Sequence, residues 1–312
     1  MKKKSSKFLP ISCLGSIYSK TILKELIFSL DSIITQEYRP NEIILIVDGF
    51  INNDIYSFLK FVESDNKSIK VFYLKENIGL GLALNYGLKK CKNNIVARFD
   101  TDDINLKNRF KIQYDLIKND ENISILGSSV LEFQNNISNI ILKTVPTDYK
   151  NIVKTSRFRN PLNHPTVIFK KDDILKVGSY RNIRFFEDYD LWLRSIKNNL
   201  IIKNINMPLV AMKRETYLFR RTGLRYVFHE LNFIKECFNL KTIKKLFLLF
   251  FILRIFIRLL PVKISSLVRF FDLSRINRDM KNEITNEISR FKNVEYSYLN
   301  RYKKFMLENY KN

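Results

Sequence analysis

The sequence predicts an α/β fold built around a mostly parallel central sheet, and two observations carry that prediction. Apolar runs typical of strands alternate with segments whose apolar residues recur at helical spacing. Groups of acidic residues also follow directly after two of the apolar runs. The chain has 312 residues, 46% of them hydrophobic, with 25 Phe, which allows a large core and excludes a disordered protein.

The alternation runs through the first 215 residues. The expected strands are 11–14, 42–47, 69–74, 94–99, 123–133 and one that follows the turn-rich start of 161–171. The expected helices are 20–36, 55–62, 79–91, 110–118 and 185–199. The run EIILIV at 42–47 is typical of a strand that helices cover on both faces of a parallel sheet. This order predicts βαβ units, in which ligands bind beyond the carboxyl ends of the strands.

The segment VARFDTDD ends one expected strand with three carboxylates, Asp100, Asp102 and Asp103. Like charges so close repel one another unless a cation or hydrogen-bond donors hold them. A divalent cation, Mg²⁺ or Mn²⁺, that also binds the phosphates of a nucleotide would explain the cluster. The alternative is a solvated acidic turn that caps the next helix.

A second acidic group, Glu187, Asp188 and Asp190, opens the expected helix at 185–199. A carboxylate in a cleft can act as a general base that takes a proton from an attacking hydroxyl. The alternative is that these acids only complement the positive end of the helix dipole.

Three other features have a structural and a functional interpretation. Asp48 follows EIILIV, where an acid either forms a turn or contacts a ribose or base. The GLG at 79–81 lacks the spacing of a dinucleotide-binding loop. His164 lies in the loop motif NHPT, where a histidine without a partner is usually structural.

Taken together, these motifs resemble one family. SIYSK (16–20), EIILIVDG (42–49), ENIGLGLALNYGL (76–88), VARFDTDD (96–103), NHPT (163–166) and EDYDLW (187–192) stand in that family's order and spacing. The chain resembles a family-2 inverting glycosyltransferase of the GT-A fold, of the bacterial exopolysaccharide, capsule or O-antigen type. The resemblance covers residues 8–215.

The resemblance implies roles for the acidic residues. Asp100 and Asp102 match the D-x-D motif that holds the metal and the donor's ribose and diphosphate, and Asp103 adjoins it. Asp188 matches the catalytic base, with Glu187 beside it.

The resemblance also implies residues around the donor and the acceptor. Asp48 matches the acid that contacts the nucleotide base or ribose, and Tyr18 lies on the loop that lines the same pocket. Gly49 and Ile78 depart from the family pattern, which often has Asp and Arg there, so we expect Arg98 to serve the donor phosphates. His164 is expected on the acceptor side.

The resemblance implies a reaction as well. The protein is expected to move a sugar from a nucleotide diphosphate donor, a UDP-sugar first of all, to a hydroxyl of a polyprenyl-linked glycan. A sugar-phosphate nucleotidyltransferase is the alternative enzyme, but it should carry a glycine-rich basic loop after its first strand, and SCLGSIYSK has one glycine and one lysine. A basic binding protein without catalysis would explain the net charge of +23. The first 215 residues lack interleaved basic and aromatic residues, so no nucleic-acid partner is expected.

The last third of the chain differs in composition. Residues 1–215 are expected to form the catalytic domain, and residues 216–312 a basic, apolar helical region for membrane or partner association. That region holds 20 of the 54 Lys and Arg, and the apolar stretch 246–260 within it is interrupted by Arg254 and Arg258. The stretch is too short to span a bilayer and favours a helix lying in the headgroup region, the alternative being a helix packed on the catalytic domain.

The cellular location follows from the same features. Three widely spaced cysteines fit a reducing compartment, and the broken apolar run at the N-terminus does not resemble a secretory signal. We therefore expect a cytoplasmic protein that is peripheral on the inner face of the cell membrane.

Overall fold

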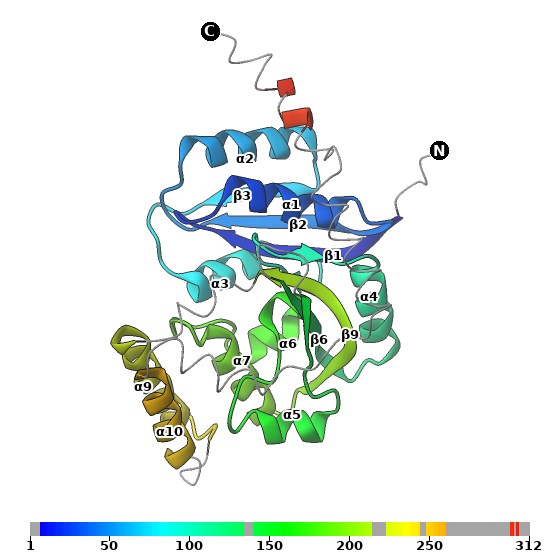
Figure 1. Cartoon of the computed structure of the whole chain (residues 1–312). Coiled ribbons are helices and arrows are strands. Elements are labelled where there is room, and N and C mark those ends of the chain that lie inside the picture. The colour runs from blue at the N-terminus through cyan, green and yellow to red at the C-terminus, as the bar shows by residue number, and fades with distance from the viewer. Residues whose placement is uncertain are drawn as a thin grey trace.

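The fold is centred on a nine-stranded sheet (Figure 1). The computed structural model describes residues 7–133, 140–213, 223–243, 248–259, 300–302 and 304–305. Within these residues the strand order is β3-β2-β1-β4-β8-β6-β9-β5, and β7 pairs with β6. The strands are β1 Lys7–Ile17, β2 Tyr38–Val47, β3 Ile69–Tyr73, β4 Ile95–Arg98, β5 Ile104–Asn105, β6 Ile123–Phe133, β7 Ile140–Lys143, β8 Ile168–Lys170 and β9 Ile201–Lys213.

The first half of the sheet is parallel, as the sequence predicts. β1 pairs in parallel with both β2 and β4, and β2 pairs in parallel with β3. The second half is mixed, because β8 runs antiparallel to both β4 and β6, whereas β9 is parallel to β6. β9 was not expected as a strand, since Lys203, Asn204, Asn206 and Pro208 break the apolar pattern that marks the other strands.

Helices cover both faces of the parallel half. The α-helices of the described residues are α1 Leu23–Ile34, α2 Asn53–Asp65, α3 Leu80–Lys90, α4 Arg109–Asn119, α5 Tyr149–Thr155, α6 Lys171–Lys176, α7 Glu187–Lys197, α9 Leu224–Asn239 and α10 Leu248–Leu259. Alternate residues of β2 enter different cores: Leu45 packs in the cluster with α1 and α2, and Ile46 in the cluster with α3 and α7. Burial on both faces explains why this strand is apolar throughout.

The two helices next to the site, α3 and α7, approach closely at Gly81. A Cβ on Gly81 would lie 2.3 Å from the carbonyl oxygen of Arg181 and 3.2 Å from the Cβ of Glu187. The second glycine of the GLG motif therefore serves packing, because no larger residue fits without moving the segment that leads into α7.

The helix pair α9–α10 packs against α7 through a separate apolar core (Figure 1). This core includes Phe186, Tyr189, Phe233 and Phe251. Arg254 and Arg258 of α10 both pair with Glu230 of α9, whose side chain is fully buried. The expectation that these two arginines belong to a basic face turned to lipid headgroups is therefore wrong, because they neutralise a buried carboxylate inside the pair.

Exposed apolar side chains lie on both helices instead. On α10 they are Leu249, Phe250, Ile252, Leu253, Phe256 and Leu259, and on α9 they are Leu224, Phe228 and Leu231, together with the exposed polar residues Arg225, Asn232, Lys235 and Asn239. The helix expected in the apolar stretch is present as α10, Leu248–Leu259. Among the helices that the structure describes, none is long and apolar enough to cross a membrane.

The far end of the chain returns to the catalytic domain. Tyr302 packs among Phe58 and Phe61 of α2, and Arg301 forms an ion pair with Asp65 at 2.6 Å. Contacts therefore cross the boundary drawn at residue 215. The helical end expected at 272–312 lies outside the described residues except for these few.

The close contact at Gly81 makes a stability prediction. Gly81→Ala should lower the free energy of unfolding by about 1–3 kcal/mol, although alanine favours a helix by about 1 kcal/mol, because a backbone carbonyl cannot move aside. Gly87→Ala is the comparison for crowding by side chains: its Cβ would lie 2.5 Å from Leu14 Cδ1 and 2.8 Å from Ile46 Cγ1, which can shift, so it should cost less stability than Gly81→Ala. Urea unfolding measures both, and a Gly81→Ala variant at least as stable as wild type would contradict the packing argument.

Candidate active site

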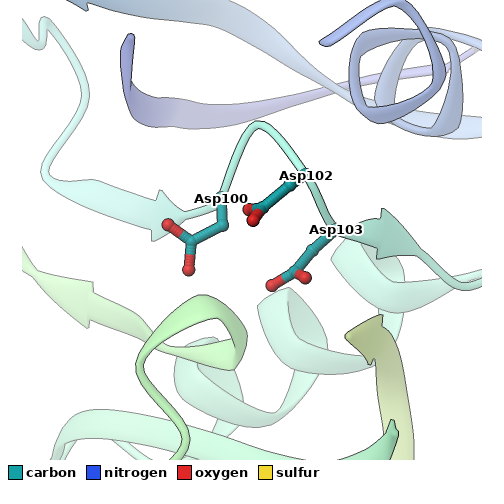
Figure 2. A group of neighbouring side chains, drawn as sticks. All are labelled: Asp100, Asp102 and Asp103. Atoms are coloured by element: carbon teal, nitrogen blue, oxygen red, sulfur yellow. The ribbon is translucent and has the colours of Figure 1, made fainter. Parts of the chain in front are cut away.

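The three predicted carboxylates lie together in the loop that follows β4 (Figure 2). Carboxylate oxygens of Asp100, Asp102 and Asp103 lie within 4.8 Å of one another. The loop is fixed by the carbonyl of Asp100, which accepts from the Asp103 N–H at 3.3 Å and from Ser29 Oγ at 2.8 Å. The backbone therefore holds the three acids together even though their charges repel.

The alternative that these acids cap the next helix is contradicted. The loop leads into the short strand β5, and α4 begins only at Arg109. The N-cap residue of α4 is Asn108, which makes no capping hydrogen bond with its side chain. The acidic cluster thus has no part in starting a helix.

Electrostatics at the cluster favour a bound cation. Burial raises the pKa of Asp103 well above its usual range, and repulsion from Asp102 and Asp100 raises it further. Asp100 pairs with Arg98, which is itself buried. A second buried arginine, Arg109, also acts on Asp103 and Asp100, so the three carboxylates lie near two arginines at a point where oxygen ligands converge. This set fits Mg²⁺ or Mn²⁺, which prefer carboxylate ligands.

Arg98 has further capacity to bind an anion. Its Nε and Nη1 atoms are buried and have no hydrogen-bond partner within the part of the chain that the structure describes. Its charge lies beside the carboxylates, where the phosphates of a nucleotide would meet the cation. The role of Arg98 toward a donor phosphate stays a prediction.

The second acidic group separates into residues of different kinds. Asp188, in the first turn of α7, is half-buried and accepts from Asn160 Nδ2 at 2.6 Å and from the Tyr189 N–H at 2.7 Å. Asp190 is buried and is held by Arg181 and Arg194. Asp188 is only half-buried, so it stays partly accessible to a hydroxyl that enters the site. Asp190 instead forms ion pairs with both arginines, and Glu187 is buried beside Gly81.

Tyr180 links the two acidic groups. Burial raises its pKa; Asp188, Glu187 and Asp100 raise it further, whereas Arg98 lowers it. Its hydroxyl lies 2.9 Å from His164 Nε2. Carboxylates from both acidic groups, which are far apart in the sequence, therefore contribute to the electrostatics of one buried hydroxyl.

His164 has the partner that the sequence did not reveal. Its ring also lies edge-on to Trp192 of α7, with centroids 6.2 Å apart. Burial, and to a lesser degree Arg98, holds the pKa of His164 well below its usual range. A neutral imidazole at this place can orient the hydroxyl of Tyr180. The place of His164 on the acceptor side stays a prediction.

Asp48 shapes a loop at the carboxyl end of β2. Its carboxylate accepts from the N–H groups of Ile78 and Gly79, at 2.7 and 3.1 Å, and from Asn77 Nδ2 at 3.0 Å. Burial raises the pKa of Asp48, and the hydrogen bonds from the Ile78 and Gly79 N–H groups lower it by a smaller amount. A Cβ on Gly49 would lie 2.6 Å from the backbone nitrogen of Asn77, which explains the D-G pair at this position.

Tyr18 lies at the end of the neighbouring strand. It is half-buried, and the N–H of Asp48 donates to the carbonyl of Ile17 at 2.7 Å, so Tyr18 and Asp48 end adjacent parallel strands. The two predicted donor-binding residues therefore lie on the same edge of the sheet as the acidic loop after β4.

Two residues of the site were not predicted. Asn160 and Tyr180 contact Asp188 and His164, respectively, across long stretches of sequence. For Asn160 the only sequence signal is its place immediately before Pro161 and the NHPT motif. Tyr180 carries none.

Comparisons with known proteins agree with this geometry. The model of the family "Glycosyl transferase family 2" matches residues 17–177. A UDP-Gal:alpha-D-GlcNAc-diphosphoundecaprenol beta-1,3-galactosyltransferase of Escherichia coli is 38% identical over 82% of this chain and 94% of its own length. The amylovoran biosynthesis glycosyltransferase AmsE of Erwinia amylovora is 33% identical over 82% of this chain and 96% of its own length.

Solved structures show the same fold. The S. aureus TarS fragment 1–349, in complex with UDP-GlcNAc, superposes with a TM-score of 0.52 over 71% of this chain and 64% of that one, at 17% identity. GalNAc-T7 with UDP, GalNAc and Mn²⁺ gives a TM-score of 0.54 over 66% of this chain and 44% of that one, at 18% identity. The α/β fold is therefore of the GT-A type, as predicted.

The chain belongs to glycosyl transferase family 2. It is a glycosyltransferase, and its relatives include enzymes named for exopolysaccharide and O-antigen synthesis. This finding removes the two other classes that the sequence left open, the nucleotidyltransferase and the basic binding protein without catalysis.

The carboxylate cluster makes a prediction about metal binding. In isothermal titration with UDP and Mn²⁺, Asp102→Ala should weaken Mn²⁺-dependent binding at least about tenfold, because one of few charged ligands is lost. Its melting temperature in EDTA should equal or exceed that of wild type, since repulsion at Asp103 is relieved. Because the pKa of Asp103 is raised, protons should also compete with the metal as the pH falls toward that pKa.

The exposed Asp172→Asn is the control for this experiment and should bind as wild type does. If Asp102→Ala binds UDP and Mn²⁺ with wild-type affinity, the metal site is elsewhere.

Proposed function

We propose that this glycosyltransferase moves a sugar from a UDP-sugar to a hydroxyl of a polyprenyl-diphosphate-linked glycan precursor, with inversion at the anomeric carbon. The observation that carries the proposal is the convergence of three carboxylates, Asp100, Asp102 and Asp103, in the loop after β4, where their oxygens lie within 4.8 Å of one another. The half-buried Asp188 at the start of α7 supplies the proposed proton acceptor. The names of the E. coli relative and of the TarS complex support UDP as the nucleotide, and the former supports the lipid-linked acceptor.

The donor half of the site is assigned to the edge formed by the first strands. Asp100, Asp102 and Asp103 would hold the divalent cation, Mg²⁺ or Mn²⁺, with Arg98 beside the donor phosphates. When bound, the cation supplies positive charge that offsets the charge developing on the diphosphate. Tyr18 and the loop that Asp48 fixes would border the nucleoside.

The acceptor half of the site is assigned to the start of α7. Asp188 takes the proton of the acceptor hydroxyl while that oxygen forms a bond to the anomeric carbon. The bond from this carbon to the diphosphate breaks on the opposite face, and UDP leaves with the electron pair. One bond forms and one breaks on opposite sides of the same carbon, so the configuration inverts. Glu187 stays beside the base, and His164 orients Tyr180 on this side of the site.

The proposed base makes a prediction about turnover. Asp188→Asn should lower kcat at least about 100-fold while UDP binding stays within twofold, because the amide fills the same space but cannot accept a proton. The assay uses the full chain with Mn²⁺, a synthetic GlcNAc-diphospho-lipid and a panel of UDP-Gal, UDP-Glc, UDP-GlcNAc and UDP-GalNAc. Asp172→Asn, an exposed acid on α6, is the control. Transfer by Asp188→Asn at the wild-type rate would exclude this base.

We also propose that the protein works as a peripheral protein on the cytoplasmic face of the cell membrane, with residues 216–312 supplying the attachment. The outward face of α9–α10 supports this location. Leu249 and Phe256 of α10 and Phe228 of α9 are 66%, 63% and 62% exposed, respectively. An apolar face of this kind gains free energy by entering the interface of a bilayer, and the exposed Arg225 and Lys235 can meet anionic headgroups. A lipid-linked acceptor would lie at that surface.

The location makes a prediction about vesicle binding. The full chain should float with vesicles of phosphatidylcholine and phosphatidylglycerol at low salt. The triple variant Leu249→Ser, Leu253→Ser, Phe256→Ser should bind at least about tenfold more weakly, because each loses apolar area that the bilayer would bury. A matched triple of exposed residues elsewhere, Leu116→Ser, Leu175→Ser, Met207→Ser, should float as wild type does. Equal flotation of both triples would place the attachment elsewhere.

A further inference from the structure

We infer that Asn160 and Arg254 are positioning residues for Asp188, so that the helix pair α9–α10 is part of the catalytic assembly as well as a surface of the molecule. The inference rests on the proposed role of Asp188 as base. It is carried by a series of contacts that joins Asp188, Asn160, the segment 156–160 and Arg254.

The first contact fixes the direction of the carboxylate. Asn160 Nδ2 donates to Asp188 Oδ2 at 2.6 Å, and the Tyr189 N–H donates to Oδ1 at 2.7 Å. Two donors on the two oxygens define the plane of the carboxylate. The carboxylate is then held in a fixed direction, which is what a base in the first turn of a helix needs to meet a hydroxyl.

The second contact fixes the amide of Asn160. Its Oδ1 accepts from the N–H of Leu162 at 3.2 Å, so the carbonyl end of the amide faces the backbone. The Nδ2 end is therefore the one that faces Asp188. Pro161, which stands between, restricts the backbone on both sides of the peptide bond that joins it to Asn160.

The segment 156–160 has no regular secondary structure of its own, since α5 ends at Thr155. Contacts from two other elements hold it. Tyr189 Oη of α7 donates to the carbonyl of Ser156 at 2.7 Å, and Arg254 Nη1 of α10 donates to the carbonyl of Phe158 at 2.9 Å. The ring of Phe158 also packs edge-on against Phe250, with centroids 5.1 Å apart. α10 therefore holds the segment that presents Asn160.

Arg254 is in turn fixed inside the helix pair. Its Nε pairs with Glu230, which also accepts from Arg258 Nε at 3.1 Å, and its guanidinium lies over the ring of Phe251 at 4.6 Å. A planar guanidinium can bind a carboxylate on one edge and a carbonyl on the other. Lysine has a single charged nitrogen and cannot hold both partners in this geometry, so the arginine has a role beyond neutralising Glu230.

The test separates positioning from stability by steady-state kinetics of the full chain in detergent, using the UDP-sugar that the panel identifies. Asn160→Ala should lower kcat about 10- to 100-fold, as expected for loss of a hydrogen bond to a charged group. The KM for the donor and the melting temperature should stay near wild type. Asn122→Ala, an exposed asparagine far from the site, is the control.

Arg254→Lys retains the charge that Glu230 needs and should lower kcat about 3- to 10-fold with little change in KM. The double variant Asn160→Ala, Arg254→Lys should turn over no more slowly than Asn160→Ala alone, because both act through the same contact with Asp188. Arg301→Ala, which loses an ion pair with Asp65 of α2, is the arginine control.

Two results would overturn the inference. One is a wild-type kcat in Asn160→Ala, and the other is a kcat of the double variant that falls by the product of the two single-variant factors. If the wild-type chain transfers none of the sugars, the proposed function fails, and a crystal structure of Asn160→Ala decides the inference separately. The carboxylate of Asp188 should then adopt a different rotamer from wild type, and an unmoved carboxylate would overturn the inference.

Discussion

Repulsion among three carboxylates at the end of β4 is the constraint on which the architecture of the site depends. The backbone turn from Asp100 to Asp103 and the hydroxyl of Ser29 hold the acids close together, and the buried Arg98 compensates only part of their charge. Close carboxylates of like charge cost stability, which a divalent cation would offset under the proposed function. A site of this kind must be surrounded by elements rigid enough to resist the repulsion.

The surrounding sheet supplies that rigidity. β1, β2 and β4 are parallel and buried on both faces, and their carboxyl ends deliver Tyr18, Asp48 and the acidic loop to one edge. Gly81 lets α3 approach α7, which brings the start of α7 toward this edge. The donor-side and acceptor-side residues that we propose therefore come from two halves of the sequence, and helix packing at Gly81 contributes to bringing them together.

The parallel half of the fold could be predicted from the sequence because its signals are local. EIILIV is apolar on both faces, and acids follow the strands at the positions where parallel sheets bind ligands. β9 and the antiparallel pairing of β8 could not be predicted, since pairing between distant strands leaves no local pattern and polar residues interrupt β9. The three acids after β4 were predicted as a group, whereas Asn160 and Tyr180 were missed because their roles depend on partners far along the chain.

The C-terminal helices show how charge in a sequence can mislead. Arg254 and Arg258 interrupt an apolar stretch and suggest a basic face, yet both turn inward to Glu230, which leaves apolar side chains outside. Counting charges along the chain cannot show this, because the buried acid lies on another helix.

The central claim is that Asp188 activates an acceptor hydroxyl for direct displacement at the anomeric carbon. The anomeric configuration of the product, read from its proton coupling constant by NMR, tests this most directly. From an α-linked UDP-sugar the account predicts a β linkage, whereas an α linkage would require two displacements or front-face attack and would contradict the account.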